Sequence, residues 1–565
     1  MCGIVGFLGK NAVKTSVEKL KLLEYRGYDS AGVAFVKNGN IVCKKAVGRI
    51  VNLEQKIGEE SEVAIAHTRW ATHGKVNETN AHPHLHGEEW AIVHNGIIEN
   101  YKAIKGNEPF MSETDSESIV FLLEKYGKGL KSVTQTINEI SGSFAFLALC
   151  KDGSLYAVKN KSPLFLAMKN GEVMIASDPS CFCGFACFYY AFCDGQIGEI
   201  KDGRVNFFNS KGEKIKLKRN KLKIQKQHEE CEKKESNMRK EIYQTPYVLE
   251  SIDKIYNGEF LSKQVRSFAK YEKIFFIGCG TAYHACLYGA LVFNKHTRFD
   301  ARALVAGEMR YGDDKVDSKS ICFFVSQSGE TADTLGCVQK AKEKGAFTVA
   351  LTNVGYSTLA NVCEVVLPTL AGIERAVAST KAYVAQTIIL KKLAYAFLGV
   401  KVYEEIENED VERLESEAIT FAKVLQNEKS MFLLGRKTDY VTAKESALKI
   451  KEVSYINANA YEASELKHGF IALIETGSVV ITYATEPQLL TKSISSAQES
   501  KARGAYCVLI TSLYCENEDD FDKVVRVKSQ TEAVIFSQLL SLHLAQNLGK
   551  NVDMPKNLAK SVTVE

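Results

Sequence analysis

The 565-residue sequence predicts an α+β domain of packed antiparallel sheets with helices, followed by two tandem α/β domains with parallel sheets. Three observations carry this prediction. The first part of the chain holds many short alternating strand patterns with few helices between them. The later part holds continuous apolar runs separated by helical patterns, which is typical of strands buried on both faces of a parallel sheet. The segment FFIGCG at 275–280 is echoed by MFLLGR at 431–436, which indicates that one α/β unit occurs twice.

In the first part, alternation of apolar and polar residues predicts the strands. They cover Ile4–Leu8, Gly32–Val36, Val63–His67, Trp90–His94, Phe144–Cys150, Leu155–Lys159 and Val173–Ala176. Helices are expected at Ser16–Leu23 and Ser116–Tyr126. Because Glu117 follows Thr114 by three residues, a capping box should open the second helix.

In the later part, the predicted strands are apolar throughout and alternate with helices. The first set is Lys273–Gly278, Ile321–Ser326, Phe347–Thr352 and Val362–Pro368, and the second is Met431–Gly435, Val479–Tyr483, Tyr506–Thr511 and Val524–Val527. Changes of pattern and composition set the expected boundaries. They are residues 1–214 for the first domain, 215–240 for a linker, 241–405 and 420–550 for the two α/β domains, and 551–565 for a C-terminal tail.

The composition is that of an ordinary globular protein, with 45% hydrophobic and 25% charged residues. A net charge of +4 is too small to indicate a nucleic-acid or membrane partner, and the basic run from Lys211 to Lys226 fits a solvated strand and linker. We see no secretory signal and no membrane-spanning run, so we expect a cytoplasmic protein. The 15 cysteines form no CxxC pairs. The cluster from Cys181 to Cys193 leaves zinc as a minor alternative to buried thiols.

Cys2 is the expected nucleophile of the first domain. If Met1 is removed, one residue carries both a thiol and a free α-amine. A thiol at its ordinary pKa is only a few per cent thiolate at neutral pH, and it needs a base. The α-amine titrates at about 7.7–8.0 and can serve as that base.

Polar residues between positions 67 and 115 suit an amide-binding pocket. Arg69 can hold a carboxylate with two hydrogen bonds, and Asp115 can hold an ammonium group. Asn95 and the Gly96 N–H can form an oxyanion hole. Five of the 11 histidines fall between His67 and His86, which makes zinc the rival interpretation. Their spacing resembles no helical HExxH pattern, so we expect no metal.

The first α/β domain carries a predicted phosphate site. The strand ending at Ser326 runs into Gln327-Ser328-Gly329-Glu330-Thr331 and then a helix. Hydroxyls, an amide and free helix N–H groups would converge there. Gly278-Cys279-Gly280-Thr281 likewise ends a strand and opens a helix, but it lacks the third glycine of a dinucleotide motif. A phosphorylated sugar therefore suits the site better than a nucleotide.

At this point the chain resembles a known family. MCGIVG, YRGYDSAG, HTRWATHG, NAHPH, VHNGIIEN and SETDSE are similar to a class II glutamine amidotransferase domain, which has the N-terminal-nucleophile glutaminase fold. SQSGETADT, VASTKA, ESALKIKEVSY, ELKHG and LAKSVTVE are similar to two sugar isomerase (SIS) domains. The combination resembles the family of isomerising glutamine–fructose-6-phosphate aminotransferases, and it covers nearly the whole chain.

The resemblance implies roles for individual residues of the first domain. Cys2 attacks the side-chain amide of glutamine, and its α-amine is the base, while Asn95 and Gly96 stabilise the oxyanion. The implied glutamine-binding residues are Arg69, Trp70, Thr72, His73, His82 and Asp115. Trp70 is also implied to gate a channel that carries ammonia to the sugar.

In the SIS domains, the resemblance implies one sugar-phosphate site. Its binding residues would be Thr281, Ser326, Gln327, Ser328, Thr331, Val377 and Ser379. Lys560 would form a Schiff base with the ketose, and Glu452 would move a proton between carbons 1 and 2 with Lys449 nearby. His468 would assist ring opening from the neighbouring subunit of a homodimer. Ala282 departs from the serine that many relatives carry beside the sugar.

The expected reaction gives glucosamine 6-phosphate and glutamate from fructose 6-phosphate and glutamine, without a cofactor. Two alternatives stay open: a synthase or deglycase acting on another ketose phosphate, and a sugar-phosphate sensor without catalysis. The sensor predicts loss of Cys2, Glu452 or Lys560, all of which are present.

Overall fold

The computed structural model describes residues 2–71, 73–201, 203–222, 236–312, 314–516 and 518–562. The chain divides into two compact units. Unit 1 comprises Met1–Lys226 with Ala559–Glu565, and unit 2 comprises Gln227–Leu558. Among the described residues, no helix combines the length and apolarity needed to cross a bilayer.

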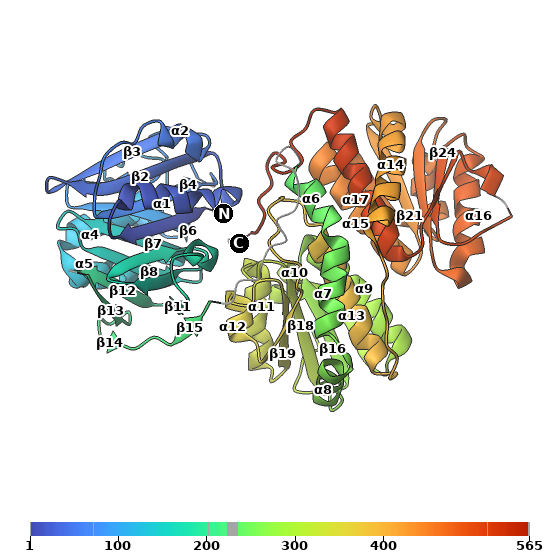
Figure 1. Cartoon of the computed structure of the whole chain (residues 1–565), viewed down its shortest axis with the longest axis horizontal. Helices are drawn as coiled ribbons and strands as arrows, with labels where there is room; N and C mark the ends of the chain where they lie inside the picture. The colour runs from blue at the N-terminus through green and yellow to red at the C-terminus, as the bar shows by residue number, and fades with distance from the viewer. Residues whose placement is uncertain are drawn as a thin grey trace. The chain divides into compact units, whose positions relative to one another are not determined.

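Unit 1 is built from two antiparallel sheets and short helices (Figure 1). The strands are β1 Gly3–Leu8, β2 Ser30–Lys37, β3 Asn40–Val47, β4 Val63–Arg69, β5 His84–Leu85, β6 Trp90–Ile98, β7 Gly142–Cys150, β8 Leu155–Asn160, β9 Phe165–Lys169, β10 Glu172–Ala176, β11 Phe188–Ala191, β12 Gln196–Lys201, β13 Arg204–Phe208, β14 Lys214–Ile215 and β15 Arg219–Lys221. The helices are α1 Ala12–Lys21, α2 Ile50–Glu54, α3 Tyr101–Lys105, α4 Glu117–Tyr126 and α5 Gly129–Glu139.

The two sheets of unit 1 pack face to face. One has the order β15-β11-β9-β10-β1-β4-β2-β3, and the other has the order β14-β13-β12-β8-β7-β6-β5. Their inner faces bury alternate apolar residues, such as Ile4 and Ile65 from one sheet and Val93 and Leu147 from the other. Helices α4 and α5 cover the outer face of the second sheet, while α1 packs on β1 and β4. The expected α+β glutaminase fold, with antiparallel sheets between helices, is confirmed.

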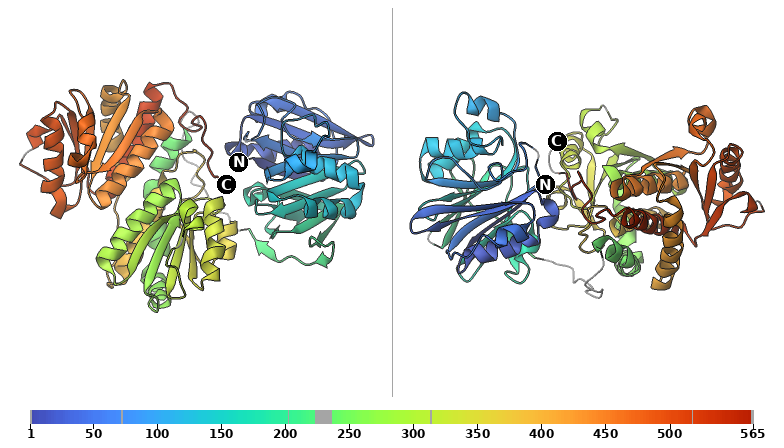
Figure 2. Two further views of the ribbon diagram at one scale, coloured as in Figure 1. Left: turned by 180° about the vertical axis from the view of Figure 1, so that it is seen from behind. Right: turned by 90° about the horizontal axis from the view of Figure 1, so that it is seen from above.

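Unit 2 contains two five-stranded parallel sheets, each with helices on both faces (Figures 1 and 2). The first half comprises α6 Asn237–Tyr243, α7 Thr245–Ile255, α8 Gly258–Phe268, β16 Lys273–Gly278, α9 Gly280–His296, β17 Asp300–Val305, α10 Ala306–Tyr311, β18 Ser320–Ser326, α11 Ala332–Glu343, β19 Phe347–Thr352, α12 Thr358–Val362, β20 Val365–Pro368 and α13 Lys381–Ala396. The second half comprises α14 Asn408–Leu425, β21 Ser430–Gly435, α15 Thr438–Ser454, β22 Asn457–Glu462, β23 Val479–Ala484, α16 Leu490–Lys501, β24 Tyr506–Thr511, β25 Lys523–Arg526 and α17 Gln530–Asn547.

The two halves of unit 2 are copies of one arrangement, which confirms the predicted tandem repeat. Their sheet orders are β17-β16-β18-β19-β20 and β22-β21-β23-β24-β25, so the strands correspond one to one. The central strands β16 and β21 begin 157 residues apart, at 273 and 430. One apolar core runs through both copies and includes α9, α13, α15 and α17.

Three expectations need correction or comment. The edge strands β17 and β22 were missed because their sequences, DARALV and NANAYE, are not continuously apolar. The capping box at α4 was wrong, because the Glu117 carboxylate accepts N–H groups of Met111 and Ser112 and the Thr114 hydroxyl contacts His84. Half of the predicted 215–240 linker, residues 223–235, lies outside the described residues.

Candidate active sites

The predicted nucleophile lies where three strands of unit 1 meet. Cys2 precedes β1, and pairing of Gly3 with Thr68 brings it beside the end of β4. The Trp70 N–H lies 3.3 Å from the Cys2 sulfur, which in turn lies 3.6 Å from the Trp70 carbonyl. From β6, the Asn95 side-chain amide donates to the Cys2 carbonyl at 2.9 Å. The structure thus brings together the predicted nucleophile and a predicted oxyanion residue.

The environment of the thiol makes a base necessary. Burial raises the pKa of Cys2 above its ordinary value, and the hydrogen bond from the Trp70 backbone only partly offsets this. A neutral thiol is a poor nucleophile at neutral pH. The α-amine that removal of Met1 would expose belongs to the same residue, so it suits this need.

Gly96 has a backbone conformation that a side chain would not tolerate. Its φ is +138°, and a Cβ atom there would lie 1.9 Å from the Ser143 carbonyl oxygen on the neighbouring strand β7. Glycine alone lets β6 and β7 approach this closely with the Gly96 peptide in this orientation. Packing therefore requires glycine at the position beside Asn95.

Arg69 organises the loop that follows β4. Its guanidinium donates to the His73 carbonyl, to the Gly74 carbonyl at 3.2 Å and to the Lys75 carbonyl at 3.3 Å. The His73 ring lies edge-on to Tyr101, and the half-buried Trp70 lies edge-on to Tyr28 at 5.7 Å. Thr72 lies outside the described residues.

Asp115 is buried just before α4 and bonded to β6. Its carboxylate accepts the Ile98 N–H at 2.7 Å, three residues along the strand from Asn95. Since this bond uses one carboxylate oxygen, the other remains available to an ammonium group. The contact ties the predicted amino-acid end of the pocket to the predicted oxyanion strand.

A cluster of four histidines fills the interior next to these residues, and the sequence did not predict it. His82 lies between His67 and His84, with ring centroids 4.1 and 4.4 Å away, and His94 is 6.5 Å from it. Burial lowers the pKa of His67 to about 3 and of His94 to about 4, and it lowers those of His82 and His84 well below the usual value. These four histidines are therefore neutral at pH 7. The ring N–H of His67 donates to the His94 carbonyl at 2.9 Å, next to Asn95.

In unit 2, a buried charge cluster lies between α9 and α15. Lys449 is 1% exposed, and its ammonium lies 2.5 Å from Glu452, 3.5 Å from Glu445 and 3.0 Å from the Thr281 hydroxyl. The Thr281 hydroxyl in turn donates to Glu445 at 3.1 Å. A surface ion pair, the plain alternative for Lys449 and Glu452, is excluded by this burial.

The charge of Lys449 is held by its neighbours. Burial alone would lower its pKa, but the carboxylates of Glu452 and Glu445 raise it, with Glu374 adding to the effect. A lysine that stays charged holds the Glu452 carboxylate in a fixed orientation. Glu452 remains about one-fifth exposed, so it can still reach a bound molecule.

The predicted phosphate loop joins β18 to α11 and is internally ordered. Ser326 lies 3.0 Å from the Thr331 hydroxyl and accepts the Gly329 N–H, while Ser328 accepts the Glu330 N–H. Gly329 has φ +66°, and a Cβ there would lie 2.1 Å from the Ser357 side chain. Gln327 joins the loop to β19 through its carbonyl, which accepts the Asn353 N–H.

The remaining predicted residues lie in several segments. Val377 donates its N–H to Asp553, and the Ser379 hydroxyl donates to Glu374. His468 is exposed in a short 3₁₀ turn. Lys560 is half-buried in the C-terminal segment that groups with unit 1. Their expected roles at the sugar stay predictions.

The sequence did not predict two residues of the charge cluster around Lys449, namely Glu445 and His284. Glu445 is 1% exposed and pairs with His284 at 2.7 Å as well as with Lys449. The signal was available, since Glu445 precedes Lys449 by four residues on one helix. Among the described residues, no three His, Cys, Asp or Glu side chains are placed to hold a metal ion. Of the cysteine cluster, Cys181 is buried, whereas Cys183, Cys187 and Cys193 are exposed.

Comparison with known proteins places this geometry in a family. Residues 67–184 match the glutamine amidotransferase domain, and residues 267–396 and 424–545 each match the SIS domain. Proteins named glutamine–fructose-6-phosphate aminotransferase (isomerizing) are 39% identical in Caldanaerobacter subterraneus, 38% in Clostridium tetani and 36% in Aquifex aeolicus, over the whole of both chains. The solved C-terminal domain of glucosamine-fructose-6-phosphate aminotransferase from Francisella tularensis matches 57% of this chain and 99% of its own, with TM-score 0.51 and 29% identity. The chain belongs to the family of isomerising glutamine–fructose-6-phosphate aminotransferases.

Proposed function

We propose that this protein transfers ammonia from glutamine to fructose 6-phosphate and isomerises the product to glucosamine 6-phosphate, releasing glutamate. The observation that carries the proposal is the buried Glu445–Lys449–Glu452 cluster bonded to Thr281, at the strand ends of a sugar isomerase domain. A carboxylate held in place by a buried, charged lysine is suited to moving a proton between adjacent carbons. The full-length match to named relatives supports the same reaction.

In the glutaminase step, the Cys2 thiol gives its proton to the α-amine and attacks the amide carbon of glutamine. Asn95 and the Gly96 N–H hold the oxyanion of the tetrahedral intermediate. Ammonia leaves with a proton returned by the amine, and water then releases glutamate from the thioester. Arg69 and Asp115 hold the carboxylate and ammonium ends of the amino acid, with His73, Thr72 and His82 lining the pocket.

In the sugar step, the Lys560 amine condenses with the ketone at carbon 2 and releases water. Ammonia displaces the lysine and leaves an imine at that carbon. Glu452 removes a proton from carbon 1, which gives an enolamine, and returns a proton to carbon 2. Ser326, Gln327, Ser328 and Thr331 hold the phosphate, while Thr281, Val377 and Ser379 line the sugar.

We further propose a homodimer in which His468 opens the sugar ring at the site of the partner. The exposure of His468 supports this. If subunits share the site, inactive His468→Ala and Lys560→Ala chains should recover part of their activity when mixed as heterodimers. Full activity in a verified monomer would contradict the proposal.

The decisive assay measures glutamate and glucosamine 6-phosphate together. Wild type with glutamine and fructose 6-phosphate should form both. Glu452→Gln should still release glutamate but form no amino sugar, and Cys2→Ala should form amino sugar only when ammonia is added. Glutamate without amino sugar in the wild type would overturn the assignment of fructose 6-phosphate, and tagatose 6-phosphate and sorbose 6-phosphate would then be tried in its place.

A further inference from the structure

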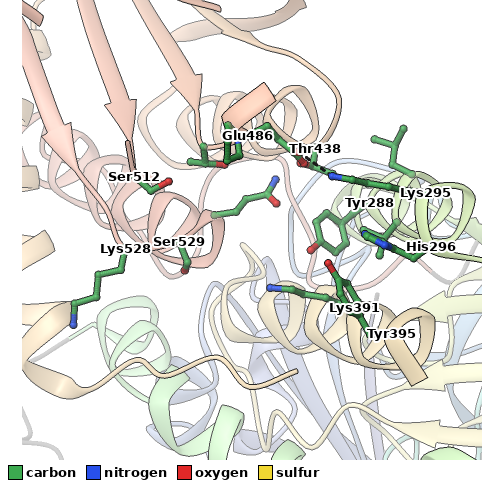
Figure 3. A pocket seen from close by; sticks show the side chains of 15 residues that line it. Tyr288, Lys295, His296, Lys391, Tyr395, Thr438, Glu486, Ser512, Lys528 and Ser529 are labelled. Carbon is green, nitrogen blue, oxygen red and sulfur yellow. Dashed lines mark hydrogen bonds and ion pairs between the residues drawn. The ribbon is translucent and has the colours of Figure 1, made fainter. Parts of the chain in front are cut away.

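The duplication in unit 2 creates a second cavity that the proposed reaction does not use. It has a volume of about 300 Å³ and lies at the carboxyl ends of β23, β24 and β25 (Figure 3). Helices α9 and α13 of the first SIS domain complete its walls. In open α/β sheets this edge is where ligands bind.

The cavity is the counterpart of the predicted sugar site. Both α9 and α15 have 17 residues, and each brings its C-terminal half to the N-terminal end of the other. At the spacing of 157 residues, Thr281 corresponds to Thr438 and Glu452 to Lys295. Thr281 contacts Lys449 in one copy, and Thr438 contacts Glu486 at 2.6 Å in the other, where Glu486 pairs with Lys295 at 3.1 Å.

The second copy cannot carry out the proton transfer. A lysine, Lys295, stands where Glu452 stands in the first copy, and the counterpart of Lys449 is Val292. The one carboxylate in the lining, Glu486, is already bonded to Thr438 and Lys295. The cavity is therefore suited to binding and not to isomerisation.

The lining favours an anionic, hydroxyl-bearing ligand. Lys391 points into it, and Ser512, Ser529 and Gln530 add polar groups, whereas the Lys528 side chain points away from it (Figure 3). Lys391 pairs with Glu404 at 2.9 Å, but an ammonium has three donors, so it can also hold a phosphate oxygen. Ser529 and Gln530 begin the 18-residue helix α17, whose first N–H groups and dipole favour an anion.

The loop after β23 excludes the phosphate position used in the first copy. Asp439 accepts the N–H groups of Thr485 and Glu486 at 2.9 and 3.2 Å, so the backbone donors of this loop are already occupied. A phosphate would therefore lie toward α17. We propose that this cavity is a second, non-catalytic site for a sugar phosphate, held by Lys391 and the start of α17.

Equilibrium dialysis with glucitol 6-phosphate, which has no carbonyl to react, tests this on the full chain. Wild type should bind two equivalents per chain. Ser512→Phe, which fills the cavity, should bind one, and the matched Ser512→Ala should keep two. The remaining equivalent in Ser512→Phe also shows that the variant is folded.

Two further variants separate this proposal from the proposed function. Ser328→Asp places a negative charge in the first phosphate loop and should leave only the second equivalent. Lys391→Gln should weaken that equivalent roughly tenfold, whereas Lys528→Gln, whose lysine pairs with Asp410 and points away from the cavity, should not. One equivalent in the wild type and none in Ser328→Asp would overturn the second site and leave the proposed function intact. If the wild type binds one equivalent and Ser328→Asp still binds it, the equivalent at the first phosphate loop is missing. That result would count against the proposed function.

Discussion

Mild acid should selectively lower the stability of unit 1 through its cluster of four buried histidines. Burial lowers the pKa of His67 to about 3 and of His94 to about 4, and it lowers those of His82 and His84 well below the usual value. In the unfolded chain these rings titrate near ~6.5. As the pH falls through that value, the unfolded state therefore binds more protons than the folded state, and stability decreases.

The magnitude follows from the difference between the two states. At pH 5, a histidine that is protonated in the unfolded chain but neutral in the fold costs roughly 2 kcal/mol. Four such residues together cost roughly 8 kcal/mol, against a typical total domain stability of about 5–15 kcal/mol. Between pH 8 and 7, the same residues should change stability by less than about 1 kcal/mol.

Hydrogen exchange of the full chain at pH 7.5 and 5.0, corrected for intrinsic rates, measures the effect. Peptides covering β4 and β6 should lose protection at pH 5. Those covering β18 and β19, which contain no histidine, serve as the internal reference. His84→Gln should remove about a quarter of the pH dependence. Equal protection of β4 and β6 at both pH values would refute the reasoning.

Three further predictions concern single residues. Gly96→Ala should abolish glutaminase activity and lower the melting temperature, because the new Cβ would meet the Ser143 carbonyl. Gly153→Ala is the control, since Gly153 also has a positive φ but a Cβ there would meet no atom within 4 Å. Equal effects of the two substitutions would refute the packing argument. Lys449→Met should cost about 3–5 kcal/mol in denaturant melts, because it removes the buried ammonium that pairs with both Glu445 and Glu452; a loss under 1 kcal/mol would contradict the cluster. Trp70→Ala should stay folded but raise the ratio of glutamate to amino sugar, and an unchanged ratio would remove Trp70 from ammonia transfer.

Much of the fold was predictable because burial sets the periodicity of each strand. Strands β16, β19 and β24 were predicted to the residue, since they are central and apolar on both faces. Helix α5 was missed because it buries only a short stripe among polar residues, and strand β9 was missed because it is only five residues long. Such segments show their partner surface only in the folded chain.

The candidate site residues were predictable where a short local motif carries the chemistry. The sequence predicted Cys2 and Asn95 together, and the β1–β4–β6 region brings them within hydrogen-bond distance. It could not predict that Glu445 and Lys449 both bond to Thr281, because those contacts depend on how α9 crosses α15. Nor could it predict that the Arg69 guanidinium donates hydrogen bonds to carbonyl groups of its own loop.

The most direct test of the account follows the nitrogen atom. The protein is incubated with amide-¹⁵N glutamine, fructose 6-phosphate and excess unlabelled ammonium, and the product is observed by NMR. We predict glucosamine 6-phosphate with ¹⁵N at carbon 2 from the wild type, and no labelled amino sugar from Cys2→Ala. An unlabelled product, or labelled ammonia without any amino sugar, would contradict the claim that this chain transfers the amide nitrogen of glutamine to the sugar.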